Sequence, residues 1–565
     1  MLDAERWKKR GWALFALCFG AAVAFALWKC PYGFGSYDDA FYLTIPHRLS
    51  MGDALFVDEW HLSQLSGLLT APLVWLYRTL TGSMDGSILA ARYAYVVCHA
   101  LVSLAFAYQL RGYGWAAGAA ALSWFLFAPY DIMALSYNTM AMDCILLWGA
   151  LLAGGRSRRG LVCAGVLLAG AVLCCPYFAA GYFLYALGVG LQALRGRGEG
   201  VFAPRRLVWL TAGVGLVSAA FAVYILSTCG VRGVLDNLPY LLSDPEHPAL
   251  SPLVKLQLGW DGLLRSHGGV PWLLGGWCVL LGALLADRRR GERRGGYLAA
   301  ACALALAGFA LFAPRSAEVY YNAIMLPMAI VGLTAYLLCR DRPRELFVTL
   351  YLGGVVYAGA VTLGSNNYAY AISMAGAVIT AASLLFLGRL LGEMAGDRAG
   401  LRRLAAGAGA ATAAALLLLQ LHVKAVHCFM DDSPAALTQT LQEGPARGVR
   451  TTPYRASVYQ RLNGELGYYR TQPPGKLLIL NERAWCYLSA DPMEYAAFSA
   501  WMSGENQAAL DRLEAYYRLN PDKVPDYIYL AKNALFDDPE AIVAAALAQG
   551  YTLEESELSY YLARG

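Results

Sequence analysis

The 565-residue chain contains few charged residues and no recognisable metal or redox motif. Asp, Glu, Lys and Arg make up only 15% of it and hydrophobic residues 58%, which is too apolar for a soluble globular protein. Its thirteen cysteines form no CxxC pair and no zinc-ligand spacing, and most lie inside apolar runs, as small buried residues do. Cys428 and Cys486 differ because both lie in a polar tail, where a disulfide between them is one possibility. Internal repeats and low-complexity tracts are also absent from the sequence.

Apolar runs of membrane-spanning length indicate a polytopic α-helical membrane protein. We expect about thirteen spans, near residues 11–28, 86–110, 114–129, 137–153, 160–175, 177–194, 207–227, 270–286, 297–313, 319–339, 346–363, 369–390 and 404–424. No small-residue cleavage site follows the first run, so we interpret it as a retained helix rather than a signal peptide. Residues 65–81 are apolar too, but a span there would place the basic loops outside, so we interpret them as an interfacial helix.

The basic residues predict the orientation of these spans. Arg111 and the loops at 5–10, 156–159, 195–206, 287–294, 340–344 and 389–403 contain 24 Lys and Arg, and the opposite loops before the tail contain seven. Basic loops face the cytoplasm, which predicts a multi-pass protein of the plasma (inner) membrane with a cytoplasmic N-terminus and an extracytoplasmic tail. The predicted domains are a transmembrane catalytic domain over 1–427 and an α/β domain over 428–565. The strand-like runs KLLILN and DYIYLAK alternate in the tail with the helical patterns SVYQRLNGELGYY, QAALDRLEAYYRL and PEAIVAAALAQ.

The first outer loop, residues 35–64, gathers an unusual number of acids for this chain. It reads GSYDDAFYLTIPHRLSMGDALFVDEWHLSQ, and its FYLTIPHRL run is typical of a short amphipathic helix at a membrane surface. Paired acids held by a structured loop at the mouth of a membrane point to chemistry. The plain alternative is that they are solvated loop acids.

The arrangement of this region resembles the GT-C superfamily of membrane glycosyltransferases that use polyprenyl-phosphate sugars. The resemblance covers roughly residues 10–130 and rests on the first helix, the YDDAFYL segment, a surface helix, a G-D-x-L turn and a second apolar surface helix. The families it suggests are the protein O-mannosyltransferases and the aminoarabinose transferases, with their bacterial relatives. Their Asp-Glu pair occupies the position of Asp38 and Asp39, so this chain has Asp where the family often has Glu, and Arg92 matches an arginine commonly seen in the second span.

The resemblance implies transfer of a sugar from a lipid phosphate to an acceptor hydroxyl, with inversion and without a covalent intermediate. We expect Asp38 to be the base, and Asp39 to hold the acceptor or the geometry, to cap the following helix, or both. The implied partners are a polyprenyl-phosphate-sugar donor, a glycan, lipid or protein acceptor, and membrane lipids; no nucleic-acid partner is expected.

The remaining predicted site residues would bind substrate. The leaving phosphate needs cations, for which we expect Lys255, Arg315 and Arg92, although Arg92 could instead snorkel or pair structurally. The other predicted substrate-binding residues are Asp58, Glu59, His61, Gln64, Tyr320, Asn322, Asn366 and Asn367. Asn366 and Asn367 also suit a plain turn.

No cofactor is predicted, and a divalent metal at His61 with Asp58 and Glu59 is a possibility that we do not favour, because D-E-x-H is not a tight ligand signature. Two other classes compete with the enzyme. A transporter or flippase of lipid-linked glycans would bury charges in mid-span, where this chain has only Asp143 and Arg92. A non-catalytic cell-envelope assembly protein would need far fewer helices.

Overall fold

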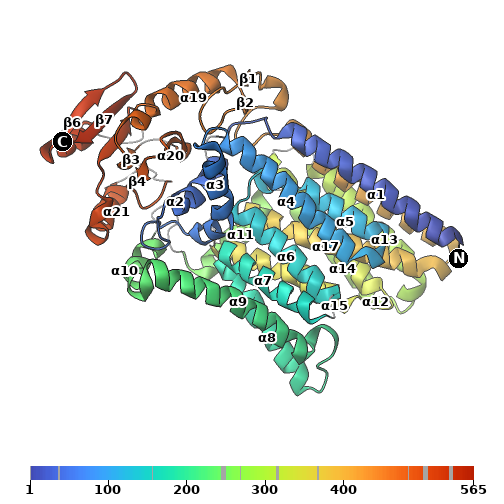
Figure 1. Ribbon diagram of the computed structural model, residues 1–565. Helices are drawn as coiled ribbons and strands as arrows, with labels where there is room; N and C mark the ends of the chain where they lie inside the picture. The colour runs from blue at the N-terminus through green and yellow to red at the C-terminus, as the bar shows by residue number, and fades with distance from the viewer. Residues whose placement is uncertain are drawn as a thin grey trace.

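A long helical bundle with a small α/β tail region at one end makes up the computed structural model of this chain (Figure 1). Residues 2–35, 38–154, 157–243, 250–266, 269–312, 317–364, 368–480, 483–500, 507–532 and 539–565 are described by the structure. The bundle comprises α1 (Leu2–Lys29), α4 (Ser87–Gln109), α5 (Trp115–Leu126), α6 (Tyr137–Gly154), α7 (Arg158–Cys174), α8 (Ala179–Leu194), α9 (Pro204–Thr228), α12 (Val270–Ala286), α13 (Arg290–Phe312), α14 (Ala317–Leu338), α15 (Arg344–Leu346), a π-helical turn (Phe347–Tyr351), α16 (Leu352–Gly364), α17 (Tyr368–Glu393) and α18 (Ala399–Val426).

The chain is a multi-pass membrane protein, but a count of thirteen spans is not confirmed. All thirteen predicted segments are helical. Within the described ranges, eight helices are long and apolar enough to cross a membrane: Gly11–Lys29, Ser87–Gln109, Pro176–Leu194, Pro204–Thr228, Arg290–Leu311, Arg344–Gly364, Ser373–Gly396 and Ala399–Val426. Others are too short by that measure, since α5 has 12 residues and α12 has 17, against about 20 for a full span.

Small residues let the bundle helices approach closely. In the span Ser373–Gly396, which includes most of α17, 83% of the apolar segment is buried. Because α17 packs against α14, α16 and α5, it forms the centre of the bundle. At the edge, α7 and α9 meet at two glycines. A Cβ on Gly165 would lie 2.0 Å from the carbonyl oxygen of Leu210, and one on Gly213 would lie 2.1 Å from that of Val162. In membranes, where lipid is as apolar as the helices, such close backbone contact stabilises helix pairs.

The two helices of the first outer loop are present, but the first is not a surface helix. Nine of the thirteen residues of α2 (Asp38–Ser50) are buried, because it packs against α3 (Gly67–Thr81), α4 and the tail. Its apolar residues occur on all sides, so a helix exposed on one face was the wrong expectation. By contrast, α3 buries Thr70 and Val74 and exposes a row of apolar side chains that includes Trp75 and Leu80, as an interfacial helix would. Two further helices, α10 (Gly230–Leu242) and α11 (Pro252–Ser266), follow α9.

The tail folds around a five-stranded sheet, as its alternating pattern predicts. The strand order is β4-β3-β5-β7-β6, in which β4 (Glu494–Tyr495), β3 (Lys476–Leu480) and β5 (Tyr527–Ala531) are parallel and β7 (Ser559–Arg564) and β6 (Tyr551–Glu555) complete the sheet antiparallel. The helices are α19 (Pro453–Leu466), α20 (Trp485–Ser489), α21 (Gln507–Leu519) and α22 (Pro539–Ala548), and β1 (Gln439–Thr440) pairs with β2 (Arg450–Thr451). The sequence predicted β3, β5 and the three longer helices, but not β6 or β7.

The tail is built directly onto the first outer loop. Arg450 accepts a hydrogen bond from the Gly33 N–H (2.9 Å) through its carbonyl and donates one to the Pro31 carbonyl (2.6 Å). The Asp431 carboxylate accepts a hydrogen bond from the Phe34 N–H at 2.7 Å. One hydrophobic core joins loop and tail, with Phe34, Phe41 and Ile45 on one side and Trp485, Tyr487 and Tyr495 on the other. Whether 428–565 is a separate domain stays a prediction, although its sheet is a distinct layer.

Candidate active site

The two acids of the YDDAFYL segment lie at the start of α2 in different surroundings. Asp39 is buried, and one of its carboxylate oxygens accepts a hydrogen bond from Arg92 Nη2 at 2.6 Å. The other oxygen accepts one from the backbone N–H of Ala40 at 3.0 Å. The Arg92 guanidinium also donates to the carbonyls of Cys30 (2.9 Å), Tyr32 (3.3 Å) and Gly33 (2.7 Å). Asp39 is thus held in one orientation by a cation that also holds the backbone before the helix.

Asp38, unlike Asp39, is not paired with a cation among the described residues. Its side chain is only partly exposed, and no described residue donates a hydrogen bond to it. Burial, and then the charge of Asp39, raise the pKa of Asp38 to about 6. Burial and the charge of Asp38 together raise the pKa of the neighbouring Tyr42 well above its usual value, and the Tyr42 ring packs edge-on against Tyr137 with centroids 5.7 Å apart. A carboxylate of this kind beside aromatic rings is suited to accept a proton near neutral pH.

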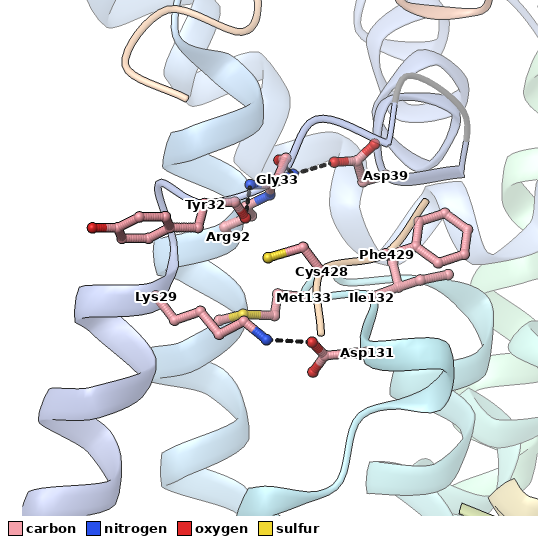
Figure 2. A pocket seen from close by; sticks show the side chains of 10 residues that line it. All are labelled: Lys29, Tyr32, Gly33, Asp39, Arg92, Asp131, Ile132, Met133, Cys428 and Phe429. Carbon is pink, nitrogen blue, oxygen red and sulfur yellow. Dashed lines mark hydrogen bonds and ion pairs between the residues drawn. The ribbon is translucent and has the colours of Figure 1, made fainter. Parts of the chain in front are cut away.

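A second buried ion cluster lies directly below, and the sequence analysis missed it. Lys29, at the end of α1, pairs with Asp131 and donates to the His427 carbonyl. Lys424, near the end of α18, lies 3.5 Å from Asp131, and His427 Nδ1 lies 3.9 Å from it. Figure 2 shows Cys428 between this cluster and the Arg92–Asp39 pair, where residues of both line one small pocket. The sequence features that could have indicated this cluster are the lysines at the ends of two predicted spans and the acid in the short PYD turn.

Backbone strain marks the same place. Tyr130 and Asp131 both have left-handed backbone conformations, with φ of 55° and 60°. For residues with side chains this costs roughly 1–3 kcal/mol each and persists only where the surroundings enforce it. The ion pairs of Asp131 with Lys29 and Lys424 compensate for this backbone strain. Gly33 also has a positive φ of 90°, and a Cβ there would lie 2.8 Å from that of Cys428, so a glycine is required where tail and loop meet.

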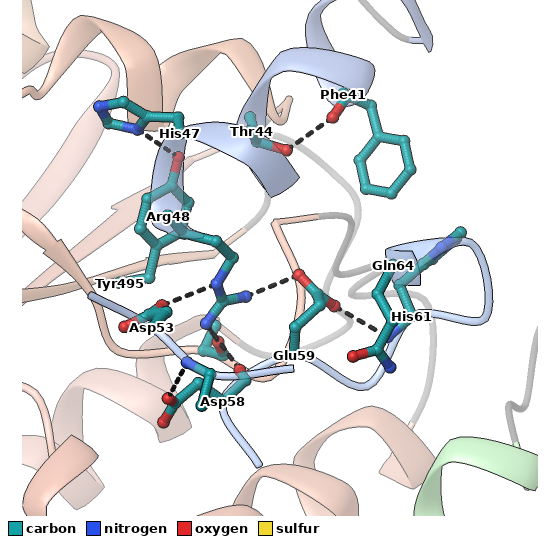
Figure 3. Close-up of polar contacts among 12 residues, drawn as sticks. Phe41, Thr44, His47, Arg48, Asp53, Asp58, Glu59, His61, Gln64 and Tyr495 are labelled. Atoms are coloured by element: carbon teal, nitrogen blue, oxygen red, sulfur yellow. Dashed lines mark hydrogen bonds and ion pairs between the residues drawn. The ribbon is translucent and has the colours of Figure 1, made fainter. Parts of the chain in front are cut away.

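The other acids of the loop surround a buried arginine. Arg48 donates through Nε to Asp53 (2.8 Å), through Nη1 to Glu59 (2.7 Å), and through Nη2 to the carbonyls of Asp58 (2.6 Å) and Ala497 (2.9 Å) (Figure 3). The aromatic ring of Tyr495 lies 4.9 Å from the centre of the guanidinium. Lys523 of the tail pairs with Asp53 and lies 3.6 Å from Asp58. These acids therefore compensate cations that join the loop to the tail.

The remaining loop candidates are part of the same framework. Glu59 Oε1 accepts a hydrogen bond from the His61 N–H at 2.8 Å, and His61 Nδ1 is 2.7 Å from the Ser63 hydroxyl. The Gln64 side-chain carbonyl accepts from the Phe56 N–H at 2.7 Å. In the described part of the chain, no three His, Cys, Asp or Glu side chains are grouped to hold one metal ion.

The predicted cations and amides of the other outer loops are only partly placed. Lys255, on α11, is half-buried and donates to the carbonyl of Leu363 at the end of α16 (3.0 Å). Arg315, Asn366 and Asn367 lie outside the described residues, and Tyr320 and Asn322 belong to α14 in a part whose side chains are not described. Cys428 and Cys486 are both free and buried, so no disulfide joins them.

Comparison with known proteins gives a distant likeness in overall arrangement. No known family and no curated protein matches the sequence. The Archaeoglobus fulgidus oligosaccharyltransferase tethered to an acceptor peptide containing the NVT sequon is similar with a TM-score of 0.46 and 12% identity, over 99% of this chain and 75% of that chain. The archaeal oligosaccharyltransferase AglB from the same organism, in complex with an inhibitory peptide and a dolichol-phosphate, is similar with a TM-score of 0.42 and 13% identity over the same shares. At these scores we draw no functional assignment from the likeness.

Proposed function

We propose that this chain is a membrane glycosyltransferase that moves a sugar from a polyprenyl-phosphate-linked donor to an acceptor hydroxyl. The observation that carries the proposal is the contrast within the acid pair. Asp39 is neutralised and oriented by Arg92, while Asp38 is partly exposed and has no cation beside it among the described residues. This is the division of roles expected of a positioning acid and a base. The resemblance of the YDDAFYL segment and the multi-pass helical bundle support the same function.

In this mechanism Asp38 accepts the proton of the acceptor hydroxyl as its oxygen attacks the anomeric carbon. The new bond joins that oxygen to the carbon, the bond from the carbon to the phosphate oxygen breaks, and polyprenyl phosphate leaves with the electron pair. A single displacement inverts the anomeric centre and needs no covalent intermediate. Asp39, fixed by Arg92, keeps α2 and therefore Asp38 in place, and Asp38 carries most of the general-base contribution.

The leaving phosphate would be stabilised by cations outside the acid pair. Arg92 already donates to four acceptors, so it acts in this proposal as a positioning residue rather than a phosphate ligand. Lys255 is the described candidate, since its ammonium donates one hydrogen bond within the described residues, to the Leu363 carbonyl, and keeps donors for a phosphate. Arg315, with Tyr320, Asn322, Asn366 and Asn367, remains a proposed substrate-binding set. Asp58, Glu59, His61 and Gln64 would act indirectly, by holding the loop.

The test is sugar transfer from a panel of radiolabelled polyprenyl-phosphate sugars in membranes containing the wild type, Asp38→Asn or Asp39→Asn. The exposed tail acid Asp432 supplies the matched control, Asp432→Asn, and equal amounts of folded protein are established first. We expect Asp38→Asn to lose about 100-fold or more, the value of a general base, and the control to lose nothing. If Asp39→Asn alone is inactive, the two roles exchange. If both variants transfer sugar as the wild type does, the acids have no catalytic role and the proposal fails.

A further inference from the structure

A broad groove lies beside α15, whose place at the end of the bundle away from the tail can be followed in Figure 1. Its volume is about 1230 Å³, and it lies between the end of α4, the α8–α9 connection, the segment 339–346 and α17. Five arginines from three separate parts of the chain line it: Arg197, Arg340, Arg342, Arg344 and Arg389. Their convergence on one hollow is more than the orientation of spans requires, because basic residues scattered over the loops would serve that purpose equally well.

Only part of this positive charge is compensated. Arg389 pairs with Asp341 (2.6 Å) and Glu393 (3.0 Å), and Arg340 lies 3.7 Å from Asp397. A second acid of the lining, Glu345, lies 3.3 Å from Arg206, an arginine that does not line the groove.

Three of the five guanidinium groups in the lining have no compensating carboxylate among the described residues. Within the described ranges, no carboxylate forms an ion pair with Arg197, Arg342 or Arg344. Arg342 instead donates to the Leu337 carbonyl and lies over the Tyr336 ring. Against these three cations the lining holds one unpaired acid, Glu199, so the groove has an excess of positive charge.

The helices that contribute residues to the groove, α4 and α8, also expose large apolar side chains near the ends that reach it. Gln109 and Gln192 line the groove, and the residues beside them, Tyr108 and Leu191, are 67% and 44% exposed. Leu194, at the end of α8, is 86% exposed. A ligand with an anionic head and long apolar chains matches this combination, because guanidinium groups bind phosphate oxygens in pairs and lipid tails cover apolar helix surfaces.

We propose that this groove binds the phosphate headgroup of an anionic glycerophospholipid, with Arg197, Arg342 and Arg344 as its ligands and the acyl chains along α4 and α8. The site is separate from the acid pair, which lies at the tail end of the bundle on α2, and does not depend on glycosyl transfer. Since guanidinium and phosphate would compensate each other, the lipid would also hold the α8–α9 connection against the segment 339–346.

The experiment places the purified full-length protein in nanodiscs of phosphatidylcholine and phosphatidylglycerol and measures, by native mass spectrometry, which lipid stays bound. We expect the wild type to retain phosphatidylglycerol preferentially. Changing Arg197, Arg342 and Arg344 to Ala should reduce that preference by about fivefold for each arginine removed. The matched control changes Arg288, Arg289 and Arg293 to Ala, which removes three charges outside the groove lining, and should leave the preference unchanged. Thermal unfolding shows whether each variant is folded, and the single exposed change Arg344→Gln replaces the triple variant if that one is not.

Three results would overturn the proposal. One is a wild type that retains both lipids equally. Another is a control triple variant that loses as much as the groove variant, which would mean diffuse surface attraction. The third is displacement of the lipid by millimolar glycerol phosphate, which would make the site one for a soluble phosphate rather than for a lipid.

Discussion

Replacing Arg48 by methionine gives the sharpest test of how the acid loop is held. The guanidinium is fully buried, and it donates to two carboxylates and two carbonyls, one of them on the tail residue Ala497. Methionine fills similar space and removes every one of these hydrogen bonds. Removing one partner of a buried ion pair costs about 3–5 kcal/mol, because the other charge stays buried. Asp53 keeps Lys523 as a partner, and Glu59 loses its only ion-pair partner among the described residues, so we expect about 3 kcal/mol.

Limited proteolysis of the detergent-solubilised protein measures this cost when it follows a site buried against the loop, such as the bond after Lys523, because that site is cleaved only when the tail opens. A loss of about 3 kcal/mol makes opening about 100-fold more frequent, and cleavage should be faster by the same factor. The control is Arg78→Met. Arg78 also joins the loop to the tail, at 2.9 Å from Asp491, but it is about one-third exposed, and a pair of this kind is worth about 1 kcal/mol or less.

A double variant separates charge from packing. Adding Glu59→Gln to Arg48→Met removes the stranded charge and should restore part of the resistance. If Arg48→Met is cleaved as slowly as the wild type, or no faster than Arg78→Met, the reasoning is refuted. The acids around Arg48 would then be available to bind substrate.

Four further outcomes are expected. The rate of sugar transfer should rise with pH through an inflection at about 6, because burial raises the pKa of Asp38 to that value and only the ionised form is a base; a profile flat between about pH 5 and 7 would contradict this. Since a raised carboxyl pKa means that ionisation disfavours the folded state above that pH, Asp38→Asn should be at least as stable as the wild type at pH 7 in thermal unfolding. Arg92→Lys should fold but transfer sugar about 10–100-fold more slowly, because an ammonium cannot replace a planar fork on four acceptors; unchanged transfer would remove the positioning role. Gly213→Ala should lower the unfolding temperature by forcing α7 and α9 apart, whereas Gly215→Ala on the same helix, with open space around it, should not.

Most of the helical framework could be predicted because it is encoded locally. Every apolar segment expected from hydropathy is a helix, and β3, β5, α19, α21 and α22 follow the expected periodicity. The number of membrane crossings is not confirmed, since α5 and α12 are shorter than a full span and α5 is largely buried within the bundle. Hydropathy measures whether a segment is apolar and cannot distinguish burial in protein from burial in lipid.

The acid pair was found from the sequence, and its surroundings were not. Asp38 and Asp39 lie next to each other in a recognisable segment, but the partner of Asp39 is 53 residues away and that of Lys29 is 102 residues away. Glu59 and Asp58 looked like substrate ligands because nothing local compensates them. Arg48 is only 11 residues from Glu59, yet one of the carbonyls that accept hydrogen bonds from Arg48 belongs to Ala497, 449 residues along the chain. Contacts of this separation leave no periodicity in the sequence.

The 449 residues between Arg48 and Ala497 also determine when, during synthesis, the acid loop can reach its final structure. A ribosome that adds about 5–20 residues per second needs roughly 20–90 s to reach Ala497 after it has made Arg48. During that interval the acid loop lacks Arg450, Asp431 and the tail core that completes it. The helices are synthesised before these contacts can form, so the acid loop reaches its final structure only after the tail residues that contact it have been made.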